Sequence, residues 1–74
     1  MKLKDLPLIY NLDKIRVWNG NRNIAELYTG SHSPVWYLKE DERTKDLLNH
    51  KIDEMAIVCE GCLGLLVVLE IYLK

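Results

Sequence analysis

The C-terminal stretch of this chain constrains its fold more than any other segment. From Leu65 to Leu69 the residues are apolar without a break, so a strand there would be apolar on both faces. Alternation would place Leu65, Val67, Leu69, Ile71 and Leu73 on one face, and Leu66, Val68, Glu70 and Tyr72 on the other. In so short a chain, we expect a helix to cover the first face and another molecule to cover the second.

This arrangement predicts a homo-oligomer, a dimer or larger. Its expected interface comprises Leu66, Val68 and Tyr72. Each of the two aliphatic side chains contributes roughly 1.5–3 kcal/mol when fully buried, so leaving them in water would weaken a small domain. A different partner protein would provide the same cover.

The size and charge of the chain limit what it can be. Its 74 residues predict a single small domain spanning residues 1–74. A net charge of -1 argues against a non-specific DNA-binding protein, which needs many Lys and Arg contacts to phosphate. The apolar C-terminal stretch is shorter than the ~20 residues that cross a bilayer, and no signal-peptide core follows Met1. We therefore expect a soluble cytoplasmic protein with no membrane partner.

The sequence predicts an α+β fold: a small four-stranded, mainly antiparallel sheet made of two β-hairpins, with one main helix between them. Residues 14–18 alternate like a half-buried strand, Asn19-Gly20 favours a tight turn, and residues 22–29 form the second strand. A helix is expected over residues 39–49, where acidic residues occupy the first turn. Residues 52–60 and 65–73 predict the second hairpin. Trp36 and Tyr37 are expected to anchor the preceding loop in the core.

A CxxC motif, Cys59-Glu60-Gly61-Cys62, is the one metal or redox signal in the sequence. Redox pairs of this spacing usually open a helix, whereas this one lies at an expected strand–turn–strand junction. A single pair also lacks the second half of a zinc site. We therefore expect reduced, non-ligating thiols, with Cys59 and Cys62 kept as a weak metal candidate.

No arrangement of catalytic residues is evident. His32 and His50 have no acidic or thiol partner at a useful spacing, and a general base needs a positioned partner. Ser31 and Ser33 flank His32 without any sign of an oxyanion site. The sequence predicts a protein that is not an enzyme and takes no cofactor.

A candidate binding surface lies on the first expected hairpin. Arg16, Trp18 and Arg22, together with Tyr28, combine guanidinium groups with aromatic rings. Such a group can stack on bases or contact phosphates, and it is equally typical of protein-interaction hot spots. Simple cross-strand packing is the third interpretation.

The order of short motifs resembles that of very short proteins encoded in phages and prophages of Gram-positive bacteria. The resemblance rests on the opening Lys-Leu-Lys-Asp-Leu at residues 2–6, a strand like residues 14–18, and the Leu-Tyr-x-Gly ending at residues 27–30. It continues in the Leu-Leu-Asn segment at residues 47–49 and the Gly-led final strand at residues 64–73. Pro7 and the pair Trp36-Tyr37 depart from that pattern.

This resemblance implies a phage accessory protein acting inside a bacterial host cell. The class includes anti-CRISPR proteins, at least one with a fold like that of PC4-type single-strand-binding proteins, and others that sequester nucleotide signals. The expected function is thus to counter host defence by binding a nuclease effector or a nucleic acid, with a nucleotide as a further ligand class. Two alternatives remain open: a small oligomeric structural or regulatory module without a defence role, and a CxxC metal or redox protein.

Overall fold

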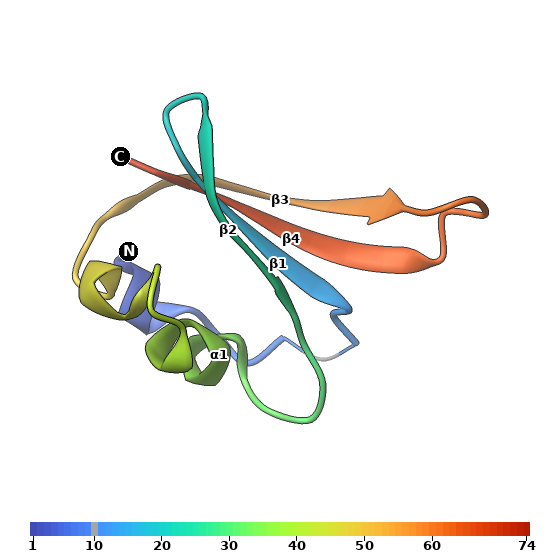
Figure 1. Ribbon diagram of the computed structural model, residues 1–74, viewed down its shortest axis with the longest axis horizontal. Coiled ribbons are helices and arrows are strands. Elements are labelled where there is room, and N and C mark those ends of the chain that lie inside the picture. The colour runs from blue at the N-terminus through green and yellow to red at the C-terminus, as the bar shows by residue number, and fades with distance from the viewer. Residues whose placement is uncertain (10) are drawn as a thin grey trace.

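Two β-hairpins lie side by side and share one sheet in the computed structural model, which describes residues 1–9 and 11–74 (Figure 1). The first hairpin pairs β1 (Lys14–Asn19) with β2 (Arg22–Tyr28), and the second pairs β3 (Ile52–Glu60) with β4 (Leu66–Leu73). The strand order is β2-β1-β4-β3, and the central strands β1 and β4 run parallel.

The α+β class and the four-stranded sheet are confirmed. The expected antiparallel arrangement is matched in part: both hairpins pair antiparallel, but the sheet is mixed because β1 and β4 pair in parallel. The helix follows the first hairpin in the chain, yet it does not separate the hairpins in space, because β1 and β4 join them directly. This pairing places Ile15 beside Leu69 and Val17 beside Ile71, so these buried aliphatic side chains lie at the centre of the sheet.

The turn of the first hairpin forms where the Asn-Gly signal predicts it, but one residue later. Asn19 pairs with Arg22, so Gly20 and Asn21 are the two central residues. Gly20 takes a positive φ of 64°, which suits glycine at the first position of a two-residue hairpin loop. A bulge shifts the register between Val17 and Trp18, and it alters which residues of β2 share a face with β1.

The helix prediction was wrong in its position. The α-helix α1 spans Pro34–Glu40 rather than residues 39–49, and a 3-10 turn, η2 (Lys45–Leu47), follows it. Ser33 caps α1 by accepting from the Trp36 amide, and Pro34 opens its first turn, where a missing N–H does no harm. Asp41 ends the helix with an extended backbone (ψ 131°) and accepts hydrogen bonds from Arg43 instead.

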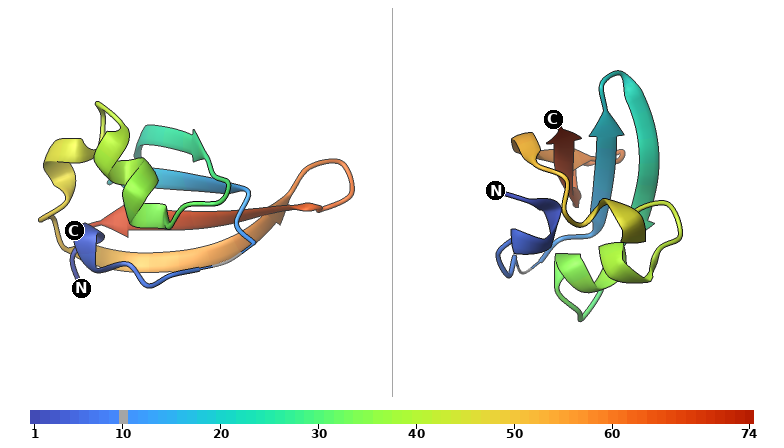
Figure 2. Two further views of the ribbon diagram at one scale, coloured as in Figure 1. Left: turned by 90° about the horizontal axis from the view of Figure 1, so that it is seen from below. Right: turned by 90° about the vertical axis from the view of Figure 1, so that its left-hand side faces the viewer.

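The hydrophobic core lies between the sheet and the helical segments. Figures 1 and 2 show α1, η2 and the N-terminal 3-10 turn η1 (Leu3–Asp5) gathered at the end of the sheet away from the β3–β4 loop. We call the sheet face that packs against these segments the inner face. Its core residues are Leu3, Leu6, Leu12, Ile15, Val17, Ala25, Leu38, Leu69, Ile71 and Leu73. Trp36, by contrast, is 39% exposed, so the expected anchoring of this ring in the core was wrong.

The two faces of β4 are covered differently from the prediction. Leu69, Ile71 and Leu73 are buried on the inner face as expected, but Leu65 precedes the strand and is 73% exposed. On the opposite, outer face, Val68 is fully buried within the single chain. It therefore has no surface left to offer to a second copy, while Leu66 and Tyr72 are half-buried.

Within residues 1–9 and 11–74, the structure contains no helix that is both long enough and apolar enough to cross a membrane.

Candidate functional site

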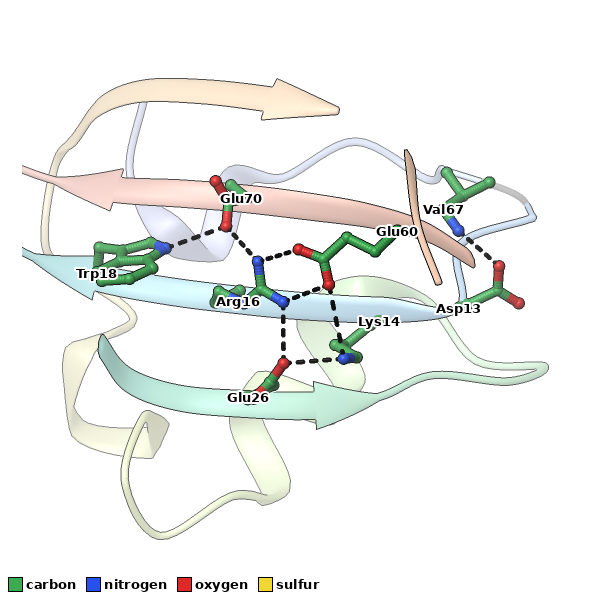
Figure 3. Close-up of polar contacts among 8 residues, drawn as sticks. All are labelled: Asp13, Lys14, Arg16, Trp18, Glu26, Glu60, Val67 and Glu70. Atoms are coloured by element: carbon green, nitrogen blue, oxygen red, sulfur yellow. Dashed lines mark hydrogen bonds and ion pairs between the residues drawn. The ribbon is translucent and has the colours of Figure 1, made fainter. Parts of the chain in front are cut away.

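Arg16 is the centre of an ion cluster on the outer face of the sheet (Figure 3). Its Nη1 donates to Glu60 Oε2 and to Glu70 Oε1, both at 2.6 Å. Its Nη2 donates to Glu60 Oε1 at 2.6 Å and to Glu26 Oε1 at 3.0 Å. The carboxylates come from three strands, and β1 carries the guanidinium between them. The hydrogen bonds that Arg16 donates to these carboxylates raise its pKa, and the bond to Glu60 makes the largest contribution.

Lys14 completes the ion cluster, which we define as Lys14, Arg16, Glu26, Glu60 and Glu70. Lys14 Nζ lies 2.9 Å from Glu26 Oε1 and 3.9 Å from Glu60 Oε1. The hydrogen bond to Glu26 raises the pKa of Lys14, and the same bond lowers the pKa of Glu26. The Arg16 hydrogen bonds lower the pKa of Glu60 and of Glu70. Two cations thus meet three carboxylates, which leaves the cluster with one net negative charge.

The ion cluster explains why Val68 is buried. In the sheet register, Val68 lies between Lys14 on β1 and Val58 on β3. Glu60, at the end of β3, bonds to the Arg16 guanidinium on β1, so its side chain crosses the outer face of β4, the strand between them (Figure 3). The register places Val68 on that face of β4, between Leu66, which pairs with Glu60, and Glu70, which pairs with Arg16. The cover that the apolar sequence demanded on this face is therefore supplied by the chain's own charged side chains, whose aliphatic stems can lie on apolar surface.

Two aromatic rings extend the outer face beyond the ion cluster. Trp18 and Tyr72 are neighbours in the β1–β4 register, and their rings stack with centroids 6.2 Å apart. Both donate to Glu70: Trp18 Nε1 to Oε1 at 3.4 Å and the Tyr72 hydroxyl to Oε2 at 2.8 Å. Trp18 and Tyr72 are thus committed to contacts within the sheet, as the cross-strand packing interpretation of the surface predicts.

Asp13, the residue before β1, forms two hydrogen bonds with Val67 next to the start of β4. Its carboxylate Oδ2 accepts from the Val67 amide at 2.7 Å, while its own amide donates to the Val67 carbonyl at 2.8 Å. Figure 3 shows this pair beside the ion cluster. The contacts fix the start of β4 against the residue before β1, and so they hold the parallel pair in register.

The predicted binding surface is divided by the structure. Arg16 and Trp18 share the outer face, but the bulge pairs Arg22 with Asn19, which alternation places on the inner side. Tyr28 is 73% exposed at the far end of β2, six residues or about 20 Å from Arg22. Lys14 Nζ lies 5.1 Å from the Tyr28 ring centre. Of the four residues, Arg22 and Tyr28 are exposed, whereas Arg16 and Trp18 are half-buried.

Cys59 and Cys62 are free and exposed at the β3–β4 turn. Among the residues that the structure describes, no group of three or more His, Cys, Asp or Glu side chains is placed to hold a metal ion. His32 is exposed and stacks on Trp36, with ring centroids 4.0 Å apart, and His50 is exposed. Neither histidine joins the ion cluster.

A small pocket lies between residues 8, 9, 11 and 12 and the loop of residues 29–34. Its volume is about 220 Å³. Pockets that hold drug-sized ligands occupy roughly 300–1,000 Å³, so a pocket of this size gives no support for a bound nucleotide.

Among the described residues, three of the exposed large apolar side chains belong to the β3–β4 hairpin. The hairpin extends beyond the helical layer (Figure 2), and Ile57, Leu63 and Leu65 are 60%, 81% and 73% exposed. Ile57 pairs with Leu69 and so shares its inner face, but at a point that the helical segments do not cover. Three exposed large apolar side chains on one projecting hairpin are typical of an interaction surface.

The sequence contained one signal for the carboxylates that our surface prediction omitted. Glu70 interrupts an apolar strand, and a charge in that position needs a partner. Nothing in the local pattern indicates that Glu26 and Glu60 converge on the same cation, because the contacts join residues 10 and 44 positions apart.

Comparisons with protein-family models, with curated proteins and with solved structures found no match to this chain.

Proposed function

We propose that this chain is a non-enzymatic binding module whose ligand is another protein. The observation that carries this proposal is the exposure of Ile57, Leu63 and Leu65 on the projecting β3–β4 hairpin. Burying such side chains against a partner contributes roughly 25 cal/mol per Å² of apolar surface removed from water. Hot spots of protein interfaces are formed by a few such anchors near the centre of the contact.

Charge favours a protein over a nucleic acid as the ligand. Phosphate binding requires cations that are free to replace counterions. Arg16, the central cation of the predicted surface, already contacts three carboxylates, and the ion cluster carries a net negative charge. An approaching phosphate would meet half-exposed Glu26 and Glu60, whose side chains are 42% and 35% exposed.

The biological setting we propose is that of a phage accessory protein that counters host defence by binding a nuclease effector. The support for the setting is the resemblance of the motif order to short phage proteins. The support for the mode of action is the apolar hairpin. The pocket beside residues 29–34 is small, and Lys14 and Arg16 are already paired with carboxylates. Neither feature favours catalysis or nucleotide binding.

A plating assay tests this proposal. Bacteria with an intact nuclease-based defence system are infected with a targeted phage, with and without the protein. We expect the wild-type chain to restore plaques and the double variant Leu63→Asp, Leu65→Asp to fail, since both positions are largely exposed and the fold should persist. The matched control is Arg22→Ala, Tyr28→Ala, which changes the exposed members of the other surface and should retain full protection.

Absence of plaques with the wild-type chain across a panel of nuclease-based systems would reject the defence role. If the Arg22→Ala, Tyr28→Ala variant loses protection while the Leu63→Asp, Leu65→Asp variant keeps it, the binding site lies on the first hairpin instead.

A further inference from the structure

We propose that the open edge of β3 binds an extended segment of the partner protein by strand addition, and that this segment is apolar at its centre and basic at its ends. The inference rests on the proposed protein-binding function and specifies how the partner is held. In such complexes, main-chain hydrogen bonds provide affinity and alternate side chains provide specificity.

Among the described residues, the edge of β3 is paired at one end only. There the N-terminal segment pairs with the start of the strand: the Ile52 amide donates to the Met1 carbonyl at 2.8 Å, and the Leu3 amide donates to the His50 carbonyl at 2.9 Å. Lys2 and Lys51 form an antiparallel bridge between them. Among the residues that the structure describes, positions 54–60 of β3 have β4 as their one strand partner.

The open part of this edge lacks the usual protection against pairing. Natural edge strands are blunted by Lys, by Pro or by bulges. The bulge of β3 lies at Ile52/Glu54, at its covered end, and the run from Met55 to Cys59 has neither a charge nor a proline. The other edge strand, β2, is interrupted by its own bulge and carries Arg22 and Glu26. The two edges are therefore not equivalent, and β3 is the better template.

The charges of β3 argue against a second copy as the occupant. Because residues 1–3 occupy the edge beside residues 50–52, a second chain can pair only with positions 54–60. The two-fold antiparallel register over that range centres on Ile57 and sets Glu54 of each copy opposite Glu60 of the other. Like charges directly opposite each other destabilise a strand pair.

A strand from another protein, with a basic residue at each end, suits the open edge of β3 better than a second copy does. A Lys or Arg opposite Glu54 would face an exposed carboxylate on the outer face. A second one, at the other end, would approach the ion cluster, which keeps one net negative charge although Glu60 is bonded to Arg16. Apolar residues at the alternate positions would lie on the inner face beside Ile57, which is 60% exposed. The partner is thus a protein segment of seven or so residues in which basic residues flank β-branched ones.

Synthetic peptides test the inference with the whole chain. The probe is the blocked peptide Lys-Val-Thr-Val-Thr-Val-Lys, and binding is followed through backbone amide shifts of the isotope-labelled protein. We expect shifts in residues 54–60, about tenfold weaker binding of the same peptide with Glu at both ends, and no binding of an analogue N-methylated at alternate residues. Ile57→Lys should weaken binding, whereas Tyr28→Lys, on the opposite edge strand β2, should not.

The outcomes separate this inference from the proposed function. Failure of the basic peptide to bind, with protection still dependent on Leu63 and Leu65, overturns the strand-addition inference and leaves the protein-binding function intact. Peptide binding at β3 without protection in any plating assay supports the edge site and rejects the defence role. A concentration-dependent dimer abolished by Ile57→Lys would identify a second copy as the occupant and overturn the choice of a basic partner.

Discussion

Arg16 and Glu60 form a two-pronged ion pair across an intervening strand. Nη1 and Nη2 of Arg16 each lie 2.6 Å from a different carboxylate oxygen of Glu60, although 44 residues separate the two in sequence. Arg16 lies on β1 and Glu60 ends β3, with β4 between them. The pair therefore joins the two hairpins over the outer face of β4, in the geometry that makes Arg–carboxylate pairs strong.

Replacing Arg16 should weaken the fold. In Arg16→Met, three carboxylates lose their shared cation, and we expect a loss of about 2 kcal/mol of unfolding free energy, the scale of hydrogen bonds to charged groups. Urea unfolding followed by tryptophan fluorescence measures the change. Arg22→Met is the matched control: Arg22 is exposed, so its stability should stay within about 0.5 kcal/mol of wild type. Equal stability of the two variants would remove the structural role of the ion cluster.

Acid should destabilise the protein through the same residues. The folded-state pKa values of Glu26, Glu60 and Glu70 are lowered by Arg16 and Lys14. A lowered folded pKa gives stability that is fully present above the unfolded value of about 4.3 and is lost as the pH falls through the folded values. We expect the melting temperature to fall below about pH 5. Arg16→Met should flatten this dependence, and a wild-type curve that stays level in acid would contradict the lowered pKa values.

The hydroxyl of Thr44 should matter more than its methyl group. Thr44 is fully buried, and its Oγ1 donates to the Leu38 carbonyl in the last turn of α1. Thr44→Val keeps the shape and leaves that carbonyl without its donor, so we expect a loss of about 1–2 kcal/mol in urea unfolding. Thr44→Ser retains the donor and should lose less. The reverse order of the two variants would attribute the stability to packing of the methyl group.

The two cysteines should be dispensable. Cys59 and Cys62 are exposed free thiols at the β3–β4 turn. The double variant Cys59→Ser, Cys62→Ser should unfold within about 0.5 kcal/mol of wild type and retain protection in the plating assay. Elemental analysis of the purified wild-type chain should find less than stoichiometric zinc. One zinc per chain or per two chains, with activity lost in the double variant, would instead establish the metal-protein alternative.

Local patterns predicted the strands, while contacts between distant residues determined the rest. Alternation in β1, the Asn-Gly turn and the apolar run of β4 depend on neighbouring residues, and the sequence revealed them. The helix begins earlier than predicted because Ser33 and Pro34 form its N-terminal cap, whereas the prediction rested on the acidic residues Glu40 and Asp41. Both signals were present, and the capping contact is the more specific of the two.

The candidate site was harder to predict because it depends on register. A bulge of one residue moved Arg22 away from Arg16, and such irregularities leave no clear mark in a single sequence. The need for a cover over Val68 was predicted correctly, but the covering group was not. The Lys14, Glu60 and Arg16 side chains cover that face, and only the parallel pairing of β1 with β4 brings Arg16 close enough to Glu60.

In-cell photo-crosslinking tests most directly the central claim that the β3–β4 hairpin, rather than the Arg16 face, contacts a protein ligand. The photoreactive residue p-benzoylphenylalanine is introduced at Leu63 or, as the matched control, at Tyr28; both side chains are strongly exposed, at 81% and 73%. Cells carrying the defence system are irradiated, and the adducts are identified by mass spectrometry. We expect a discrete protein adduct at position 63 and none at position 28. A protein or nucleic-acid adduct at position 28, with none at position 63, would contradict the account.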